Sequence, residues 1–302
     1  MADAEPIKRT SEIEEATNLH VIHPISSWLV PRFARLHVHP NAVSVAGMVS
    51  GAAAGIAYYH YHDRRYAILG FVLMILWHVM DGADGQLARL TRLQSPTGKV
   101  LDGICDYVTF VSVYAGLALA LRHDHGAWIW AVIVIAGVCH AVQAAAYEVQ
   151  RQDYNFWGWG RQSAELLDLE TRPLDRSQAP LRTRIAERLH RIYARVQVLA
   201  IGANGASRSR LATMIETQPE RAASIRALYR SSFAPVVRQW SVMSANYRTI
   251  GIFLFAFLQI PLGYFLLEIF GLSAILAILV SRQPARYAAF FDRLSDGRAG
   301  TG

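Results

Sequence analysis

Apolar stretches long enough to cross a lipid bilayer are the feature that most limits how this chain can fold. About 20 apolar residues in a helix span the roughly 30 Å of hydrocarbon in a bilayer. Hydrophobic residues make up 53% of the 302 residues and the net charge is +7, a combination unusual for a soluble enzyme. We therefore expect an all-α, polytopic membrane protein with six transmembrane helices. Their predicted positions are Val43–Tyr59, Tyr66–Met80, Val100–Leu121, Ala127–Ala146, Ile250–Phe270 and Leu272–Val280, the last extended by Arg286–Phe291.

The composition divides the chain into four regions. Residues 1–40 carry an amphipathic pattern that predicts an interfacial helix lying on the membrane, and a loop that caps the bundle is the alternative. Residues 41–150 contain the first four spans, and residues 249–302 contain the last two spans and a short polar tail. The apolar members of the interfacial pattern are Ile22, Ile25, Trp28, Leu29, Phe33 and Leu36, flanked by Arg32 and Arg35.

Residues 151–248 are the one long break in the hydrophobic pattern. They contain sixteen arginines and a helix-like stretch at Leu181–Leu199, so we expect a helical cytoplasmic insert. Its mixed charges indicate first a solvated helical face and second a surface that contacts anionic lipid headgroups.

The distribution of basic residues predicts the orientation in the membrane. If the amino terminus is cytoplasmic, six spans leave residues 61–66 and 122–126 outside, with only Arg64, Arg65 and Arg122 of the 30 basic residues. Cytoplasmic loops of membrane proteins carry the excess of Lys and Arg. We therefore expect a protein of the cytoplasmic membrane, with the ends of the second and third spans that carry its aspartates facing the cytoplasm.

Four aspartates stand in this apolar setting at Asp81, Asp84, Asp102 and Asp106. An aspartate at the centre of a membrane helix costs roughly 2.5–3.5 kcal/mol, so four without compensation could cost on the order of 10 kcal/mol. Spacings of three and four residues put each pair on one face of its helix. A short turn near residues 91–98 can bring the two faces together, and such a set of carboxylates suits magnesium or manganese.

Small residues and one arginine accompany the aspartates. Gly82, Gly85, Gly98 and Gly103 each cost a helix about 0.8–1 kcal/mol relative to alanine, so close approach of a ligand or tight helix packing must explain them. Ala88 leaves the aspartate face open, and the planar fork of Arg89 suits a phosphate. His78, three residues before Asp81, is a candidate donor to a carboxylate that holds metal. Together these residues indicate metal-assisted phosphoryl chemistry on a diphosphate.

The same residues carry a family resemblance. The chain fits the pattern Asp-x2-Asp-Gly-x2-Ala-Arg-x8-Gly-x3-Asp-x3-Asp at all eight defined positions, from Asp81 to Asp106. It thereby resembles the CDP-alcohol phosphotransferase (CDP-alcohol phosphatidyltransferase) family. The resemblance covers residues 38–150 well and the last two spans loosely, and the interior of the insert is outside it.

The resemblance implies roles for these positions. Asp81, Asp84 and Asp102 would be ligands of a two-metal site for Mg²⁺ or Mn²⁺, and Asp106 would complete that site and act as the catalytic base. Gly85, Ala88 and Gly98 would face the nucleotide, and Arg89 would contact the diphosphate. A further short motif, Pro40-Asn41-Ala42-Val43-Ser44, would add cytidine or phosphate contacts from Asn41 and Ser44. Its alternative interpretation is a helix start with Asn41 as the cap.

The implied reaction is attack by an alcohol hydroxyl on the phosphorus that carries the lipid or alcohol group, with release of CMP, in phospholipid biosynthesis. The implied partners are a CDP-linked donor, an alcohol acceptor, membrane lipid and a second copy in a homodimer, and we expect no nucleic acid. The acceptor stays open. A polar stripe at the end of the fourth span is a candidate acceptor site, formed by His140, Gln143, Tyr147 and Arg151.

Two other functions remain as alternatives. An intramembrane prenyltransferase also binds a diphosphate through aspartates and magnesium, but it should have a second aspartate set, and none follows residue 150. A transporter should have charges deep in several spans, whereas here they cluster in one block and the other spans are nearly uncharged.

Overall fold

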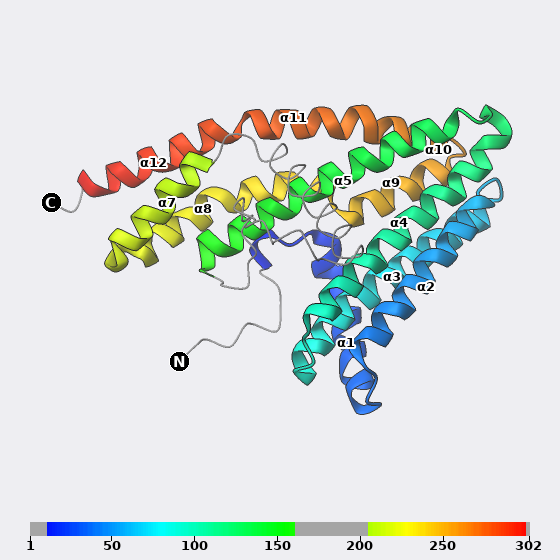
Figure 1. The fold of residues 1–302 in the computed structure, drawn as a ribbon, viewed down its shortest axis with the longest axis horizontal. Coiled ribbons are helices and arrows are strands. Elements are labelled where there is room, and N and C mark those ends of the chain that lie inside the picture. The colour runs from blue at the N-terminus through cyan, green and yellow to red at the C-terminus, as the bar shows by residue number, and fades with distance from the viewer. Residues whose placement is uncertain (1–10, 161–204, 300–302) are drawn as a thin grey trace, which may run out of the picture. The chain divides into compact units, whose positions relative to one another are not determined.

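The computed structural model describes residues 11–160 and 205–299, and all regular secondary structure in these residues is helical (Figure 1). Within these described residues, five helices are long and apolar enough to cross a membrane, namely Pro40–Tyr59, Arg64–Thr91, Val100–His125, Ile129–Gly158 and Pro261–Asp296. The expected all-α, polytopic membrane protein is therefore confirmed. The predicted helix at Leu181–Leu199 lies outside the described residues.

The chain forms two compact units that alternate along the sequence. The first contains Met1–Cys139 and Ser244–Phe270, and the second contains His140–Met243 and Gly271–Gly302. The boundary therefore falls inside two helical segments, α5 (Ile129–Asp153) and the π-helical η6 (Leu267–Leu272). The order of regions along the sequence did not indicate this grouping, in which the described part of the insert shares a unit with the end of the chain.

The long helices of the first unit begin at sequence-encoded caps. In α2 (Pro40–Tyr59) the proline occupies the first turn, and the His39 side chain accepts a hydrogen bond from the backbone N–H of Asn41. The cap is thus His39, and the interpretation of Asn41 as the cap is wrong. In α4 (Pro96–His125) Ser95 Oγ accepts from the backbone N–H of Gly98 at 3.0 Å. Since α3 (Arg64–Thr91) ends just before, the connection is the short turn of residues 92–95.

Glycines let α2 and α4 approach each other closely. A Cβ added at Gly55 would overlap the backbone of Ser112, and one added at Gly116 would overlap the carbonyl of Gly55. Small residues at such positions are how membrane helices come into contact without a hydrophobic driving force. The core beside this contact is filled by Tyr58 and Leu117, both fully buried.

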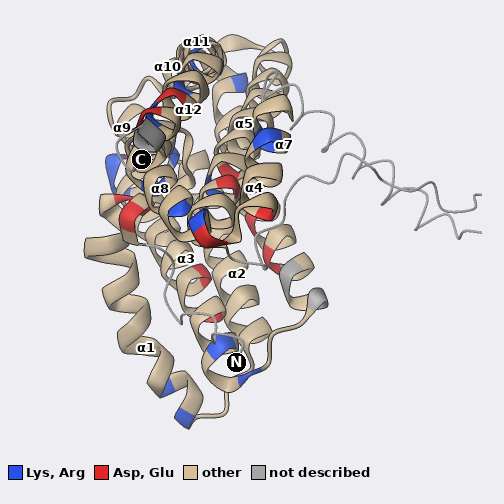
Figure 2. Ribbon diagram, turned by 90° about the vertical axis from the view of Figure 1, so that its left-hand side faces the viewer, with Lys and Arg blue, Asp and Glu red and all other residues tan. Residues whose placement is uncertain are grey.

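The α1 helix (His23–Arg35) packs along α3. Ser26 Oγ donates to the Val79 carbonyl at 2.8 Å, and Ser27 Oγ donates to Gln86 Oε1 at 3.0 Å. The opposite face of α1 exposes Trp28, and the basic residues of its last turn lie at its free end (Figure 2). A helix with one packed face and one exposed apolar face agrees with the interfacial pattern, and its placement on a membrane stays a prediction.

The last two spans are divided differently from the expectation. The predicted continuous helix over Ile250–Phe270 is wrong, because α9 (Ala245–Phe257) ends after 13 residues and Gln259 adopts a positive φ of 64°. Pro261 has no N–H to continue a helix and restricts the residue before it. The chain restarts there as α10 (Pro261–Leu266), which leads through η6 into α11 (Ser273–Ser281). Hydropathy alone could not show this turn, because all three residues before Pro261 lie within an apolar run.

The second unit contains a helical part of the insert. Its described helices are α7 (Gly205–Thr217) and α8 (Ala222–Trp240), and α8 packs on α12 (Gln283–Ala299) through aromatic rings. Tyr229 and Phe233 stack at 4.3 Å between ring centroids, and Phe290 contacts both rings edge-on at 5.7 Å. The carboxyl-terminal segment, expected as an extension of the last span and a polar tail, lies within the candidate span Pro261–Asp296 and packs on the insert as α12.

Several arginines of the insert serve the structure rather than a solvated face. Arg208 forms a mostly buried ion pair with Asp153 of α5. Arg226 donates to the Phe156 carbonyl and Arg230 to the Gly158 carbonyl, both at 2.8 Å. These carbonyls belong to the π-helical η3 (Tyr154–Gly158), where the last groups of a helix need donors. The expectation of a solvated face thus fails for these three side chains.

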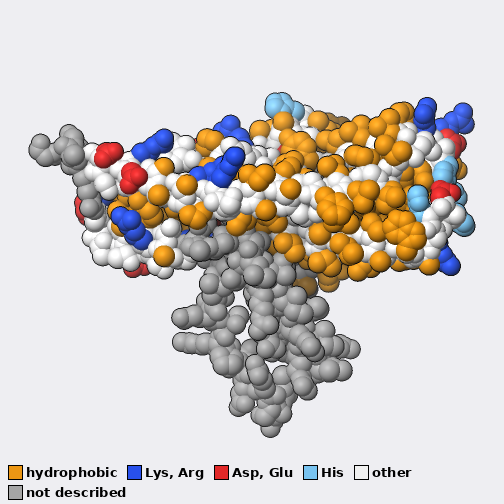
Figure 3. Space-filling view, turned by 90° about the horizontal axis from the view of Figure 1, so that it is seen from above, with side chains coloured by type: hydrophobic (Ala, Val, Ile, Leu, Met, Phe, Trp, Pro, Cys, Tyr) orange, Lys and Arg blue, Asp and Glu red, His pale blue; other side chains and the backbone are white. Residues whose placement is uncertain are grey.

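The surface agrees with a membrane environment. Large apolar side chains are exposed along the long helices, among them Ile56, Val72, Val111 and Val134. Figure 3 shows hydrophobic side chains over most of the face that it draws, with histidines and charged residues at the end where the α2–α3 and α4–α5 turns lie.

Candidate functional site

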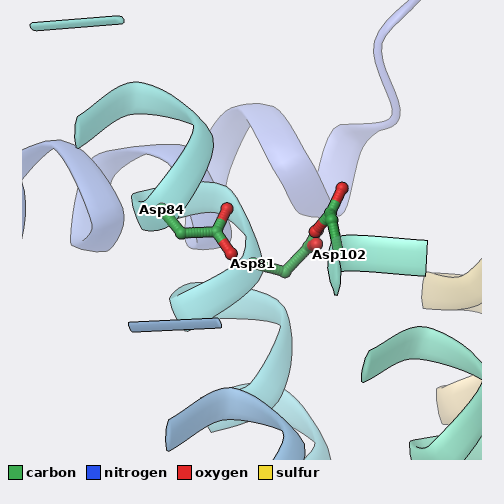
Figure 4. Close-up of side chains that lie close together, drawn as sticks. All are labelled: Asp81, Asp84 and Asp102. Atoms are coloured by element: carbon green, nitrogen blue, oxygen red, sulfur yellow. The ribbon is translucent and has the colours of Figure 1, made fainter. Parts of the chain in front are cut away.

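Three of the four predicted aspartates converge. One carboxylate oxygen from each of Asp81, Asp84 and Asp102 lies within 4.8 Å of the other two. The first two side chains extend from α3 and the third from α4, across the short turn that joins these helices (Figure 4). Asp84 is buried and the other two are half-buried. The sequence prediction that the two helix faces meet is therefore confirmed for these three residues.

The donor set fits a divalent cation. Three carboxylates at this separation repel one another in their ionised form unless a positive charge lies between them. Oxygen ligands with partial access to solvent are what Mg²⁺ and Mn²⁺ prefer, because these hard ions keep part of their water shell. The cluster of Asp81, Asp84 and Asp102 is hereafter called the aspartate cluster.

Asp106 lies one helical turn beyond Asp102 on α4 and is half-buried. It is outside the group of three whose oxygens converge. Its predicted roles as a further ligand and as a base stay predictions.

A serine of α2 orients the cluster. The Ser44 hydroxyl is buried and donates to Asp84 Oδ2, and it also lies 3.3 Å from the carbonyl of Pro40 in its own helix. A hydroxyl with a single proton donates to one acceptor at a time, and the carboxylate is the stronger acceptor. The short motif that contributed Ser44 to the prediction is therefore located beside the aspartates.

The other residues expected to face the nucleotide lie at the same end of α2, α3 and α4. The Asn41 amide oxygen lies 3.5 Å from the position that a Gly98 Cβ would take, so the first turns of α2 and α4 are adjacent. The Arg89 guanidinium folds back over Gly85, with one nitrogen 3.5 Å from the position of its missing Cβ. Ala88 is half-buried. A methyl group at Gly85 would make only ordinary van der Waals contact with Arg89, so this arginine does not explain the glycine.

Tight helix packing explains one of the two remaining glycines of the motif and not the other. A Cβ at Gly82 would lie 2.9 Å from Ser26 Oγ of α1, so this glycine permits helix packing. Gly103 has no atom within 4 Å of its missing Cβ among the described residues, so packing does not explain it. His78 does not show the expected contact with a carboxylate, because its Nε2 lies 2.9 Å from Thr249 Oγ1.

The predicted acceptor stripe belongs to the second unit. Gln143 is fully buried and donates to Ser273 Oγ at 3.0 Å. Arg151 donates to Glu148 Oε2 at 2.9 Å and lies over the buried ring of Tyr147. His140 is half-buried on the same helix. The role of these four residues in binding an acceptor stays a prediction.

Sequence reasoning missed a buried ion pair. Arg248 and Glu268 are 1% and 0% exposed and pair with each other in the first unit. The remaining spans were expected to be nearly uncharged, and this pair is an exception. The signal was present, because Glu268 is the one acidic residue within the apolar stretch Ile250–Phe270 and Arg248 lies two residues before that stretch.

The fold and the site together define an all-α integral membrane protein with three converging carboxylates of a kind that could hold a metal ion. Residues 37–203 match the sequence profile of the CDP-alcohol phosphatidyltransferase family. This match extends over more than half of the chain and contains every residue of the aspartate motif. The chain belongs to this family.

Curated relatives match part of the chain. CDP-diacylglycerol–serine O-phosphatidyltransferases of Mycobacterium bovis and Mycobacterium tuberculosis are 26% identical over 122 residues, which cover 40% of this chain and 41% of the relative. Cholinephosphotransferase 1 of Gallus gallus is 29% identical over 109 residues, 33% of this chain and 32% of the relative. The matched region thus spans less than half the length of each relative.

Proposed function

We propose that this protein is an integral membrane CDP-alcohol phosphotransferase of phospholipid biosynthesis. It transfers a substituted phosphate group, phosphatidyl or phospho-alcohol, from a CDP-linked donor to an acceptor hydroxyl and releases CMP. The observation that carries this proposal is the convergence of three carboxylates from α3 and α4 within 4.8 Å, in a chain that belongs to this family.

The residues around the cluster would bind and orient the donor. The aspartate cluster and Asp106 would hold two divalent cations, Mg²⁺ or Mn²⁺, which supply charge neutralisation at the diphosphate when bound. Ser44 keeps the Asp84 carboxylate oriented by its hydrogen bond. Arg89 offers two parallel N–H groups to the diphosphate. Gly85, Ala88 and Gly98 leave room for the cytidine, with Asn41 beside them.

The proposed step is a direct displacement at phosphorus. The acceptor oxygen forms a bond to the phosphorus that carries the alcohol or lipid group, and the bond from that phosphorus to the bridging oxygen breaks. The electron pair of the broken bond stays on the phosphate of CMP. The proton of the acceptor hydroxyl goes to the Asp106 carboxylate, which acts as general base.

Three further elements belong to the proposal. The site faces the cytoplasm of the cytoplasmic membrane, which the asymmetry of basic residues supports. Two copies associate in a homodimer. His140, Gln143, Tyr147 and Arg151 are the proposed acceptor-binding residues, and the identity of the acceptor is open, since the relatives are named for serine and for choline.

A donor and acceptor panel tests the proposal. Purified protein in lipid nanodiscs with Mg²⁺ or Mn²⁺ should release CMP from at least one CDP-linked donor, in the presence of one of a set of alcohols that includes serine and diacylglycerol. CMP is measured by chromatography with and without each acceptor. The pair that gives acceptor-dependent release identifies the substrates.

Asp106→Asn should abolish turnover while nucleotide binding persists, because the amide cannot accept the proton. Asp124→Asn is the matched control, since Asp124 lies at the far end of the same helix with an exposed side chain. If a folded protein that binds metal releases no CMP from any donor, the proposal is wrong.

A further inference from the structure

A buried polar network lies in the first unit, deeper in the helices than the aspartate cluster. Arg248, Thr249 and Glu268 are at most 1% exposed, and Tyr114 is 6% exposed. Polar side chains in the apolar part of a membrane protein are expensive and need partners. The proposed function uses none of these four residues, so their retention in the core needs another explanation.

One arm of the network holds α3. His78 Nε2 lies 2.9 Å from Thr249 Oγ1 of α9, and both side chains are buried. His78 precedes Asp81 by three residues, which is about 4.5 Å along a helix axis at 1.5 Å per residue. The hydrogen bond therefore fixes α3 to α9 less than one turn below the first ligand of the aspartate cluster.

The other arm holds α4. The Tyr114 hydroxyl donates to Glu268 Oε2 at 2.5 Å, and Glu268 is paired with Arg248 through its other carboxylate oxygen. Tyr264 also lies 3.4 Å from Glu268. Tyr114 follows Asp106 by eight residues, so it holds α4 about 12 Å below that residue.

The two arms meet at adjacent residues of one helix. Arg248 and Thr249 are neighbours near the start of α9, so the helix that carries Asp81 and Asp84 and the helix that carries Asp102 are tied to the same point. Hydrogen bonds are directional, and in a medium of low dielectric constant they hold their geometry strongly. The glycine contacts of α4 give close packing but few directional constraints on sliding or rotation.

We propose that Tyr114, Glu268, Arg248 and Thr249 are positioning residues for the aspartate cluster. They fix the axial and rotational position of α4 against α3, and this position sets the separation of the carboxylates. The link to catalysis rests on the proposed function, whereas the link to metal binding does not.

Tyr114→Phe tests the arm that holds α4. The variant loses only the hydroxyl, and its ring keeps the edge-on contact with Phe265 at 5.2 Å. Loss of a group that supports metal ligands typically weakens metal affinity 10–100-fold, and we expect about tenfold weaker Mn²⁺ binding, measured by electron paramagnetic resonance in nanodiscs. Tyr58→Phe is the matched control, because Tyr58 is equally buried in this core and its hydroxyl has no hydrogen-bond partner among the described residues.

Thr249→Val tests the arm that holds α3 with an isosteric side chain. It removes the hydrogen bond to His78, and we expect weaker Mn²⁺ binding in the same direction. Thr109→Val is its control, since Thr109 is also fully buried and its hydroxyl has no hydrogen-bond partner in the described part of the chain. If Tyr114→Phe does not fold, the comparison of Thr249→Val with Thr109→Val tests the positioning role in its place.

The outcomes separate the two proposals. If each variant binds Mn²⁺ as tightly as its control, the positioning role is wrong, even where the parent protein releases CMP. If the variants lose Mn²⁺ affinity but the parent releases no CMP from any donor, the positioning role stands and the proposed function fails. A purely structural role would lower the thermal unfolding midpoint without changing the Mn²⁺ concentration at half saturation.

Discussion

Ser44 is a residue of the largely apolar helix α2 that contacts the aspartate cluster. Its hydroxyl bonds to Asp84, the one buried member of the aspartate cluster. A buried carboxylate needs donors that favour its ionised form, and an oriented carboxylate binds a metal without first reorganising. Ser44 thus connects α2 to the pair of helices that carries the ligands.

Replacing Ser44 by alanine should therefore weaken metal binding without unfolding the protein. We expect a loss of about tenfold in Mn²⁺ affinity, at the lower end of the effect of groups that support metal ligands. Titration of Mn²⁺ by electron paramagnetic resonance measures it. Ser50→Ala is the matched control, because Ser50 is equally buried on α2 and donates to the Leu73 carbonyl instead. Equal affinities of the two variants would contradict the role of Ser44.

The sequence predicts the convergence of the carboxylates well and the hydrogen-bond partners of the neighbouring residues poorly. The spacing of Asp81, Asp84 and Asp102 is sufficient, because helical periodicity and one short turn bring such positions together. The bond from His78 to Thr249 joins residues 171 positions apart in the sequence. No local pattern determines such a contact, which depends on how α9 packs against α3.

At the scale of helices, the contact of α2 with α4 depends on the absence of side chains. Gly55 and Gly116 face each other so closely that neither leaves room for a methyl group. The position of α4, and with it Asp102, follows in part from this contact. Gly55 and Gly116 thus resemble the four glycines of the motif, because each weakens its own helix and must be explained by another role, which here is close helix packing.

Gly55→Ala should destabilise the protein because the added methyl group forces α4 away from α2. Overpacking of a tight core costs typically 1–3 kcal/mol, and we expect a lower thermal unfolding midpoint in detergent. Gly137→Ala is the control, since no atom of the described residues lies within 4 Å of its missing Cβ. That control should be neutral or stabilising by up to about 1 kcal/mol. An unchanged midpoint for Gly55→Ala would show that the two helices separate at no cost.

Helix existence is more predictable than helix boundaries in this chain. The first four spans were found because each is one apolar run between polar turns. The run from Ile250 onward contains a break at residues 258–260 that depends on a positive φ and a proline, and not on polarity. The amphipathic pattern of α12 is visible in the sequence, but its partner α8 lies in the insert.

For the whole molecule, the grouping of segments into two units follows from contacts between distant parts of the chain. The aspartate cluster, Ser44 and the positioning network all lie within the first unit. Ligand binding to this unit should therefore stabilise it by mass action.

Removal of divalent metal should lower the thermal unfolding midpoint. A ligand at a hundred times its dissociation constant adds about 2.7 kcal/mol to the stability of the state that binds it. For a protein of this size that corresponds to roughly 4 °C. Light-scattering or fluorescence melts with Mg²⁺, and with a chelator in its place, measure the difference. Asp84→Asn should melt at the same temperature in both buffers, and a full metal effect in that variant would exclude the aspartate cluster as the site.

The short α9 has a consequence for the surrounding lipid. Its 13 residues extend about 20 Å at 1.5 Å per residue, roughly 10 Å less than the hydrocarbon of an average bilayer. The helix exposes apolar side chains such as Leu254, and a bilayer that matches the length of α9 would have to be locally thinner. The protein should therefore deform the membrane on the side of α9, and lipids with short acyl chains should gather there because they fill a thin bilayer with the least strain.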